Sequence, residues 1–269
     1  DNSINQQVVR ELLERMGALV EIASSGLQAL EMLTEDDGFD VVLMDVQMPI
    51  MGGYETTQRI RKDLKNTKIP IIAVTAHALE SERQKCLAAG MNDHVAKPIE
   101  PLDLMATMLK WIDPQRLRAV APGPLESEDL EWPELPGIDV PSALRRLSGS
   151  TQFLRNLLGE FQTTWHDATA KLQSAIDEQH YAEAMRQAHT LQGVAATLAM
   201  TEVAPAAAAL EAHLKIPELQ PLPSALQRLD RALRVVIDGL ADLPPLLEST
   251  SVNRDLEAAA QRLEELSIL

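Results

Sequence analysis

The chain has 269 residues, of which 45% are hydrophobic, 24% charged and only 3% aromatic, so collagen-like, low-complexity and wholly disordered chains are excluded and two domains are expected. A formal net charge of −16 excludes a typical nucleic-acid-binding protein, because that binding depends on Lys and Arg neutralising phosphates. The single cysteine, Cys86, excludes an internal disulfide framework, and without a signal peptide or an apolar run of roughly 18 residues we expect a soluble, cytoplasmic chain.

Short apolar runs alternate with amphipathic stretches in the first part of the chain. The apolar runs predict strands near Leu19–Ile22, Val41–Met44, Ile69–Val74 and His94–Ala96. The amphipathic stretches predict helices at Ile4–Met16, Gly26–Thr34, Tyr54–Leu64, Ser81–Ala89 and Pro101–Trp111. This alternation is typical of an α/β doubly wound parallel sheet, here over residues 1–112.

The pattern changes after Trp111. Residues 113–137 contain five prolines and several acidic residues, which predicts a linker. Beyond it, Ala and Leu recur at three- and four-residue spacing, which predicts an all-α bundle over residues 138–244. Its helices are expected at Gln152–Glu178, Tyr181–Ala199, Thr201–Leu214 and Ser224–Leu240. Residues 245–269 are expected to form a helical extension through Val252–Leu269, to which the sequence assigns no role.

Polar residues stand at the ends of the predicted strands. Asp45, Thr75 and Lys97 each follow an apolar run, and Asp1 precedes the first helix. Because ligands of open α/β sheets bind at the carboxyl ends of the strands, these side chains are candidates for one site. Two carboxylates, a hydroxyl and an ammonium suit Mg²⁺ and a phosphoryl group. The alternative is that each residue merely ends its strand.

Together these residues resemble the receiver domain of two-component response regulators, a flavodoxin-like fold. The stretch Asp45-Val-Gln-Met-Pro-Ile-Met-Gly-Gly53 is similar to the phosphoacceptor loop of that family. Thr75-Ala76 is similar to its switch threonine and the small residue after it, and Lys97-Pro98 to its lysine and cis-proline pair. The resemblance covers residues 1–112.

The resemblance implies a role for each of these residues. Asp45 would be the phosphoacceptor and, with Asp1 and the backbone carbonyl of Gln47, a ligand of Mg²⁺. Thr75 would donate a hydrogen bond to the phosphoryl group, and Lys97 would pair with it. Such chemistry is mainly positioning and charge neutralisation. His94 occupies the switch position, where the family commonly has an aromatic residue.

The chain departs from the receiver pattern at its amino end. The family begins with an apolar strand that ends in paired acids, whereas this chain begins at the second acid. In the family that strand lies between the two here predicted as Leu19–Ile22 and Val41–Met44. We therefore expect a gap between these strands, a metal site lacking one carboxylate, and a natural protein that continues upstream.

His189 differs from the other histidines in its neighbours. It lies beside the predicted buried stripe of its helix, and Gln192 and Gly193 follow it three and four residues later on the same face. A glycine inside a helix costs about 1 kcal/mol relative to alanine, so something is expected to approach closely beside His189; a tight helix–helix contact is the alternative explanation. The stretch Ala188–Gly193 resembles the motif of the histidine-phosphotransfer (HPt) domain, in which this histidine accepts a phosphoryl group. Gln192 stands where that family usually has Lys or Arg, and it supplies no charge.

A receiver followed by an HPt domain resembles the C-terminal region of a hybrid sensor histidine kinase. The resemblance implies that phosphoryl passes from upstream kinase domains of the same parent to Asp45, then to His189, then to a separate response regulator. It implies Mg²⁺ as the cofactor and no nucleic acid as a binding partner. The parent would be anchored in the inner membrane. We find no nucleotide-binding glycine loop, so autophosphorylation from ATP is not expected of this chain. One alternative is a docking module without phosphoryl flow. Another is an aspartyl-phosphate phosphohydrolase, in which a second acid would stand at Gln47.

Overall fold

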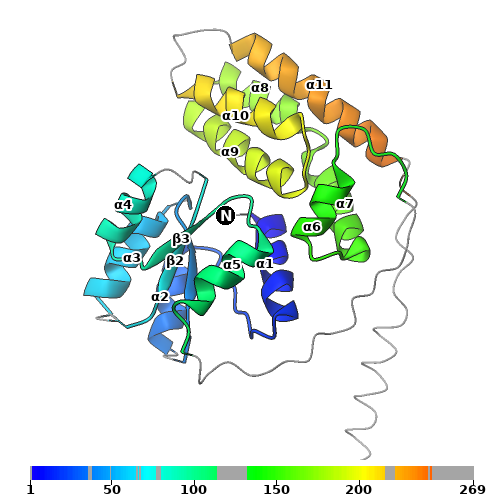
Figure 1. Cartoon of the computed structure of the whole chain (residues 1–269). Coiled ribbons are helices and arrows are strands. Elements are labelled where there is room, and N and C mark those ends of the chain that lie inside the picture. Colours follow the sequence, from blue (N-terminus) through cyan, green and yellow to red (C-terminus); the bar gives the residue numbers. More distant parts are fainter. Residues whose placement is uncertain are drawn as a thin grey trace, which may run out of the picture.

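The computed structural model describes residues 2–35, 38–48, 50–64, 66, 68–76, 80–113, 132–215, 222–241 and 243. A part built on a parallel sheet and a helical part lie against one another (Figure 1). The predictions for Asp1, for residues 114–131 and for residues 245–269 lie outside the described residues. None of the helices in the described ranges is long and apolar enough to cross a membrane.

The sheet confirms the predicted α/β fold class. It contains β1 (Val42–Asp45), β2 (Ile71–Thr75) and β3 (Asp93–Ala96), which run parallel in the order β1-β2-β3. All five residues of the central strand are buried, as expected for a strand covered on both faces. The register pairs Asp45 with Val74 and Thr75 with Ala96, so the carboxyl ends of the strands meet at one edge.

Helices cover both faces of the sheet, close to the predicted bounds. They are α1 (Ser3–Arg15), α2 (Gly26–Glu35), α3 (Gly53–Lys62), α4 (Glu80–Ala89) and α5 (Pro101–Leu109). One face packs Ile71 against Ile60 of α3 and Cys86 of α4. The other packs Ile72 against Leu104 of α5 and Leu12 of α1. These are the two layers that a doubly wound sheet requires.

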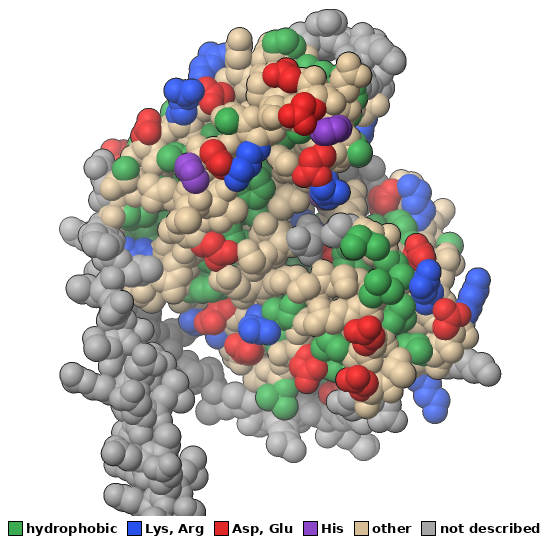
Figure 2. Space-filling view, turned by 180° about the vertical axis from the view of Figure 1, so that it is seen from behind, with side chains coloured by type: hydrophobic (Ala, Val, Ile, Leu, Met, Phe, Trp, Pro, Cys, Tyr) green, Lys and Arg blue, Asp and Glu red, His purple; other side chains and the backbone are tan. Residues whose placement is uncertain are grey.

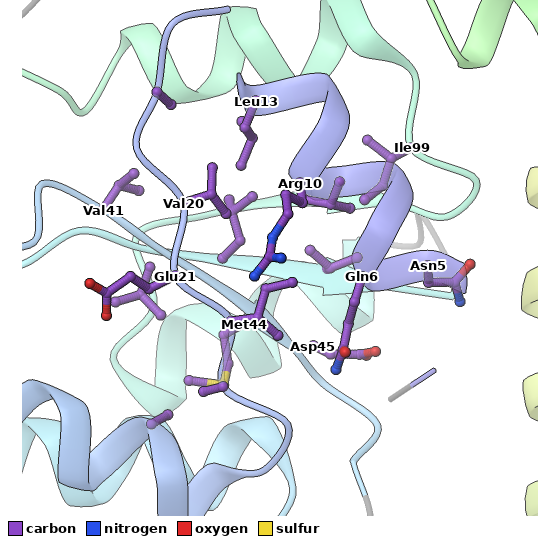
Figure 3. A pocket seen from close by; sticks show the side chains of 18 of the residues that line it. Asn5, Gln6, Arg10, Leu13, Val20, Glu21, Val41, Met44, Asp45 and Ile99 are labelled. Atoms are coloured by element: carbon purple, nitrogen blue, oxygen red, sulfur yellow. The ribbon is translucent and has the colours of Figure 1, made fainter. Parts of the chain in front are cut away.

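The strand predicted at Leu19–Ile22 is wrong for this structure. The segment has no strand assignment, and Leu19 is fully exposed. An open apolar cavity of about 270 Å³ lies between this segment, α1 and β1 (Figure 3). A strand forms only where a neighbour accepts and donates its backbone hydrogen bonds, and here the cavity occupies the neighbour's place. The gap expected between the two predicted strands is therefore present.

The helical part has one continuous core. Its helices are α6 (Val140–Arg146), α7 (Thr151–Trp165), α8 (Ala168–Asp177), α9 (Tyr181–Thr197), α10 (Val203–Leu214) and α11 (Leu222–Ala241). The prediction of one helix over Gln152–Glu178 is wrong, because the backbone leaves helical geometry at Asp167 (φ −112°, ψ 14°). The apolar residues stay near helical phase across this break, so their spacing does not reveal it. The short helix α6 was not predicted.

Residues that precede the bundle pack on it. Leu135 is buried in the helical core, Trp132 is partly buried against it, and Arg155 lies over the Trp132 ring at 5.8 Å from the centroid. On the face in Figure 2, basic side chains are interspersed with acidic ones and form no extended basic surface. The described end of the predicted linker, residues 132–137, thus belongs structurally to the bundle.

Candidate functional site

Asp45 and Lys97 meet at the carboxyl edge of the sheet. Asp45 is the last residue of β1, and Lys97 follows β3. The Lys97 Nζ lies 2.6 Å from the Asp45 Oδ2, and both side chains are largely buried, at 13% and 14% exposed. The backbone N–H of Gln47 donates to the other carboxylate oxygen, Oδ1, at 3.1 Å. The structure therefore brings together a carboxylate and an ammonium that lie 52 residues apart in the chain.

The loop after Asp45 folds back closely on its own strand. A Cβ on Gly53, the first residue of α3, would lie 2.2 Å from the backbone oxygen of Asp45. No side chain fits at that distance, so only glycine allows α3 to begin here. The pair Gly52-Gly53 in the sequence is the signal of this close approach.

Thr75 and Lys97 are linked through their backbones. Thr75 ends β2 with 3% of its surface exposed, and its carbonyl accepts the N–H of Lys97 at 2.7 Å. The Lys97–Pro98 peptide bond is cis, in agreement with the expected pair. His94, on β3, is about one-fifth exposed, and its buried Nδ1 has no hydrogen-bond partner among the described residues.

The donor set at this edge suits a hard cation. The Asp45 carboxylate and the neighbouring backbone carbonyls are oxygen ligands of the kind that Mg²⁺ takes. Asp1, the second expected carboxylate, lies outside the described residues. Within the described ranges no three His, Cys, Asp or Glu residues cluster as a metal site. The chemistry of the residues fits a Mg²⁺ site that has few protein ligands.

His189 lies in the middle of α9 with its imidazole fixed by a carboxylate. Its neighbours Ala188 and Leu191 are fully buried, as the predicted stripe requires, whereas the His189 side chain is 16% exposed. The Nδ1 of His189 lies 3.0 Å from the Oε2 of Glu211 on α10. Because an ionised carboxylate only accepts, Nδ1 carries the hydrogen in this contact, and in the neutral imidazole the lone pair is on the other ring nitrogen, Nε2.

Glu211 is a site residue that the sequence reasoning missed. Burial opposes its ionisation, but hydrogen bonds and charges from His189 and Lys215 outweigh burial and lower the pKa of Glu211 to about 2. The Lys215 Nζ lies 2.9 Å from its Oε1. The signal was the position of Glu211, four residues after Ala207 and three before Leu214. Both neighbours are buried, so helical spacing puts Glu211 on the buried face of α10.

The two groups of residues share one small cavity. It has a volume of about 30 Å³ and is lined by Ala76, Lys97, His189, Gln192, Gly193 and Ala196. The same Lys97 that pairs with Asp45 thus faces the cavity that His189 faces. The close approach expected at Gly193 is made by Asn5 of α1, whose Nδ2 would lie 3.4 Å from a Cβ at this position. The geometry can serve the movement of a small anionic group between the sheet and α9.

Comparisons with known proteins match both parts. The response regulator receiver domain matches residues 1–109, and the Hpt domain matches residues 156–242. The chain is 30% identical to the sensor histidine kinase GacS of Pseudomonas protegens over 87% of its own length, and 36% identical to the signal transduction histidine-protein kinase BarA of Escherichia coli over 59%. It spans 25% and 17% of the length of these two relatives.

Among solved structures, the chain is similar to the receiver domain of the sensor histidine kinase PA1611 from Pseudomonas aeruginosa, which has a magnesium ion coordinated in the active site cleft. The two are 38% identical with a TM-score of 0.38, over 41% of this chain and 90% of that one.

Proposed function

The chain contains a receiver domain followed by an Hpt domain, and from this premise we propose that it passes a phosphoryl group from an upstream kinase histidine to Asp45, then to His189, then to a separate response regulator. The observation that carries the proposal is the shared cavity. Lys97 pairs with Asp45 at 2.6 Å and lines, together with His189, a space of about 30 Å³. Lys97 therefore lies next to both proposed phosphoryl acceptors.

At the sheet edge, Asp45 is the nucleophile. A carboxylate oxygen attacks phosphorus, and the P–N bond to the kinase histidine breaks. Lys97 neutralises the phosphoryl oxygens, and Thr75 donates a hydrogen bond to them, so these residues act by position and charge. Mg²⁺, when held by Asp45, the carbonyl of Gln47 and Asp1, supplies further neutralisation of the same oxygens.

At α9, His189 is the second nucleophile. Its Nε2 lone pair attacks phosphorus and the bond to the Asp45 oxygen breaks, which regenerates the carboxylate. Glu211 holds the Nδ1–H and favours the positive charge that develops on the ring. Gln192 and Gly193 border the space in which the group is received, and His94 is the proposed switch position on β3.

The proposal extends to organisation and partners. The receiver domain occupies residues 1–112 and the Hpt domain residues 138–244. Residues 113–137 connect the two, and the end of this connection, residues 132–137, packs on the bundle. Residues 245–269 follow. The phosphoryl donor is a histidine kinase domain of the same parent, and the acceptor is the receiver of another chain. Any anchorage in the inner membrane belongs to upstream parts of that parent.

Labelling from a phosphorylated kinase domain tests this order. Asp45→Asn removes the first nucleophile, so both domains should lose label, whereas His189→Gln should lose only the label that is labile in acid and stable in base. Asp103→Asn and His180→Gln, at exposed positions, are the matched controls and should label normally. Label on His189 in the Asp45→Asn chain would reverse the proposed order. If label never reached His189 in the unmodified chain, the result would favour a docking module without phosphoryl flow. If Asp45 released phosphate rapidly, the result would favour an aspartyl-phosphate phosphohydrolase.

A further inference from the structure

Helix α1 and the bundle share an apolar contact. Ile4 and Val8 of α1 are 1% and 4% exposed, and both belong to the core cluster of the helical part. The Thr197 hydroxyl of α9 donates to the Asn5 Oδ1 at 3.2 Å. These contacts hold α1 on the bundle, whereas the turn that follows Lys97 is held by a different contact.

Arg146, the last residue of α6, makes that second contact. Its Nε lies 3.1 Å from the Glu100 Oε1, and its Nη1 donates to the Ala196 carbonyl of α9. Glu100 follows Lys97 by three residues, and Ala196 lines the same small cavity as Lys97 and His189. The planar guanidinium therefore joins the turn after Lys97 to the helix that carries His189.

The Glu100 side chain pairs with Arg146 and does not cap its own helix. Glu100 is the N-cap residue of α5, but its carboxylate accepts no capping hydrogen bond, as a typical N-cap side chain would. At the start of the turn, the N–H of Lys97 donates to the Thr75 carbonyl at 2.7 Å. The turn from Lys97 to Glu100 is thus tied to the sheet at one end and to Arg146 at the other.

Helix α6 presents Arg146 from a fixed position on the bundle. Ala143 in α6 and Leu147 directly after it are buried in the helical core, at 0% and 3% exposed. At the other end, Asp139 caps the helix with its side chain, and its backbone N–H donates to the Ala199 carbonyl at 3.0 Å. The Hpt match begins at residue 156, so α6 is an addition to the matched region.

We propose that Arg146 is a positioning residue for phosphoryl transfer between Asp45 and His189. It recognises the receiver by an acidic side chain at the position of Glu100. This inference rests on the proposed function, in which the bond from phosphorus to the Asp45 oxygen breaks and a bond to the His189 Nε2 forms. Such a step requires the reacting atoms to be held about 3 to 3.5 Å apart. Arg146 serves this approach through Glu100 and the turn after Lys97.

A charge swap in the full chain tests this role. A phosphorylated kinase domain labels Asp45, and the rate at which label moves to His189 is measured. Glu100→Arg places two cations together but leaves the contact of Arg146 with Ala196 in place, and it should slow transfer by about tenfold. Arg146→Glu should slow transfer at least as much. The double variant restores an ion pair of reversed sign and should transfer about threefold faster, or more, than either single variant.

Matched controls carry the same charge changes outside the contact. Arg145→Glu alters the neighbouring residue of α6, which is exposed and donates a hydrogen bond within its own helix. Glu55→Arg removes a partly exposed ion pair with Arg59 inside α3. Both controls should transfer at the rate of the unmodified chain. Unchanged rates in the two single variants, or slow transfer that the double variant does not restore, would overturn the proposal.

Hydrogen exchange separates failure of this inference from failure of the proposed function. Peptides that cover α5 should exchange about two- to fivefold faster in Glu100→Arg, as expected for the loss of a partly exposed ion pair, with α7 unchanged. Unchanged exchange in α5 would show that Arg146 does not fix the turn, which overturns the positioning role. If the unmodified chain moved no label from Asp45 to His189, the proposed function would be lost, and the exchange data would still decide whether Arg146 fixes the turn.

Discussion

The two halves of the molecule differ in where their backbone groups find hydrogen-bond partners. In the helical half each helix satisfies its own backbone, and the buried residues form one continuous core. In the sheet half the strands depend on their neighbours, and the apolar residues divide into two clusters on opposite faces of three strands. The cavity beside β1 leaves that half less completely packed than the bundle. His189, the proposed second nucleophile, therefore lies in the more completely packed half, whereas Asp45 lies beside the cavity.

Filling the cavity should remove most of this difference. A segment of about five apolar residues followed by an acid, joined to the amino end of the chain, should pair with β1 and order Leu19–Ile22 as a strand. The gain in the free energy of unfolding of the sheet half should be about 5 kcal/mol, from apolar burial and new backbone hydrogen bonds less the entropy of ordering the segment. Hydrogen exchange read by mass spectrometry reports the two halves separately.

A segment of equal length made of Gly and Ser is the control for this extension. It adds the same chain without apolar side chains and should leave the exchange rates of β1 and β2 unchanged. Equal protection by both segments would show that the cavity does not limit the stability of the sheet half.

Equal truncations in the two halves should have unequal costs. Leu158 of α7 is fully buried in the continuous core, so Leu158→Ala should lower the free energy of unfolding by about 3 to 4 kcal/mol. Leu43 of β1 lines the open cavity and is only partly buried, so Leu43→Ala should lower it by about 1 to 2 kcal/mol. Urea unfolding measures both. A cost at Leu43 as large as that at Leu158 would mean that the cavity closes in solution.

Removing the charge of Glu211 should lower the free energy of unfolding of the bundle at neutral pH. It should also make that free energy depend less on pH in the acid range. Lowering a carboxyl pKa from 4.5 to about 2 corresponds to about 3 kcal/mol, which we reduce to about 2 because Lys215 is half exposed. A depressed carboxyl pKa stabilises the fold above the unfolded pKa. Its contribution is thus full above about pH 4.5 and is lost as the pH falls toward 2.

Glu211→Gln should therefore unfold about 2 kcal/mol more easily at pH 7 and should differ little from the unmodified chain near pH 2. Urea unfolding at a series of pH values measures this difference. Glu160→Gln, a partly exposed carboxylate on α7, is the control and should have a much smaller effect on the stability of the bundle. A constant difference between pH 7 and pH 2 would contradict the role of ionised Glu211.

The sequence predicted the fold where the periodicity was local. The helices around the sheet and the strands β1, β2 and β3 were found because apolar spacing reports which face of an element is buried. Leu19–Ile22 has the composition of a strand, but a strand also requires a partner, and composition does not report one. The break in the helix at Asp167 was not predicted, because the apolar residues on both sides of it remain near helical phase.

The candidate site divides in the same way. Asp45, Thr75 and Lys97 were predicted to converge because parallel strands end at one edge, and the structure brings Asp45 and Lys97 to 2.6 Å. Glu211 was missed because its contact with His189 joins two helices, and the helical spacing of α10 alone does not show which residue of α9 it faces. The packing of α1 on α9 could not be predicted from local apolar spacing either, because it joins residues nearly 200 positions apart.

Gly193 provides the smallest test of the contrast between the halves. The cost of a glycine inside a helix suggested that α9 needs space here, and Asn5 of α1 does approach. A Cβ would nevertheless lie 3.4 Å from the Asn5 Nδ2, the end of a flexible side chain that can shift by a few tenths of an ångström. Gly193→Ala should therefore raise the stability of the bundle by about 0.5 to 1 kcal/mol, as helix propensity predicts, with α1 still docked.

Gly193→Leu is the contrasting variant, because its larger side chain cannot fit beside α1 and should expose Ile4. Thermal unfolding together with hydrogen exchange of α1 measures both effects, and loss of α1 protection in the alanine variant would mean that the docking of the receiver requires glycine itself.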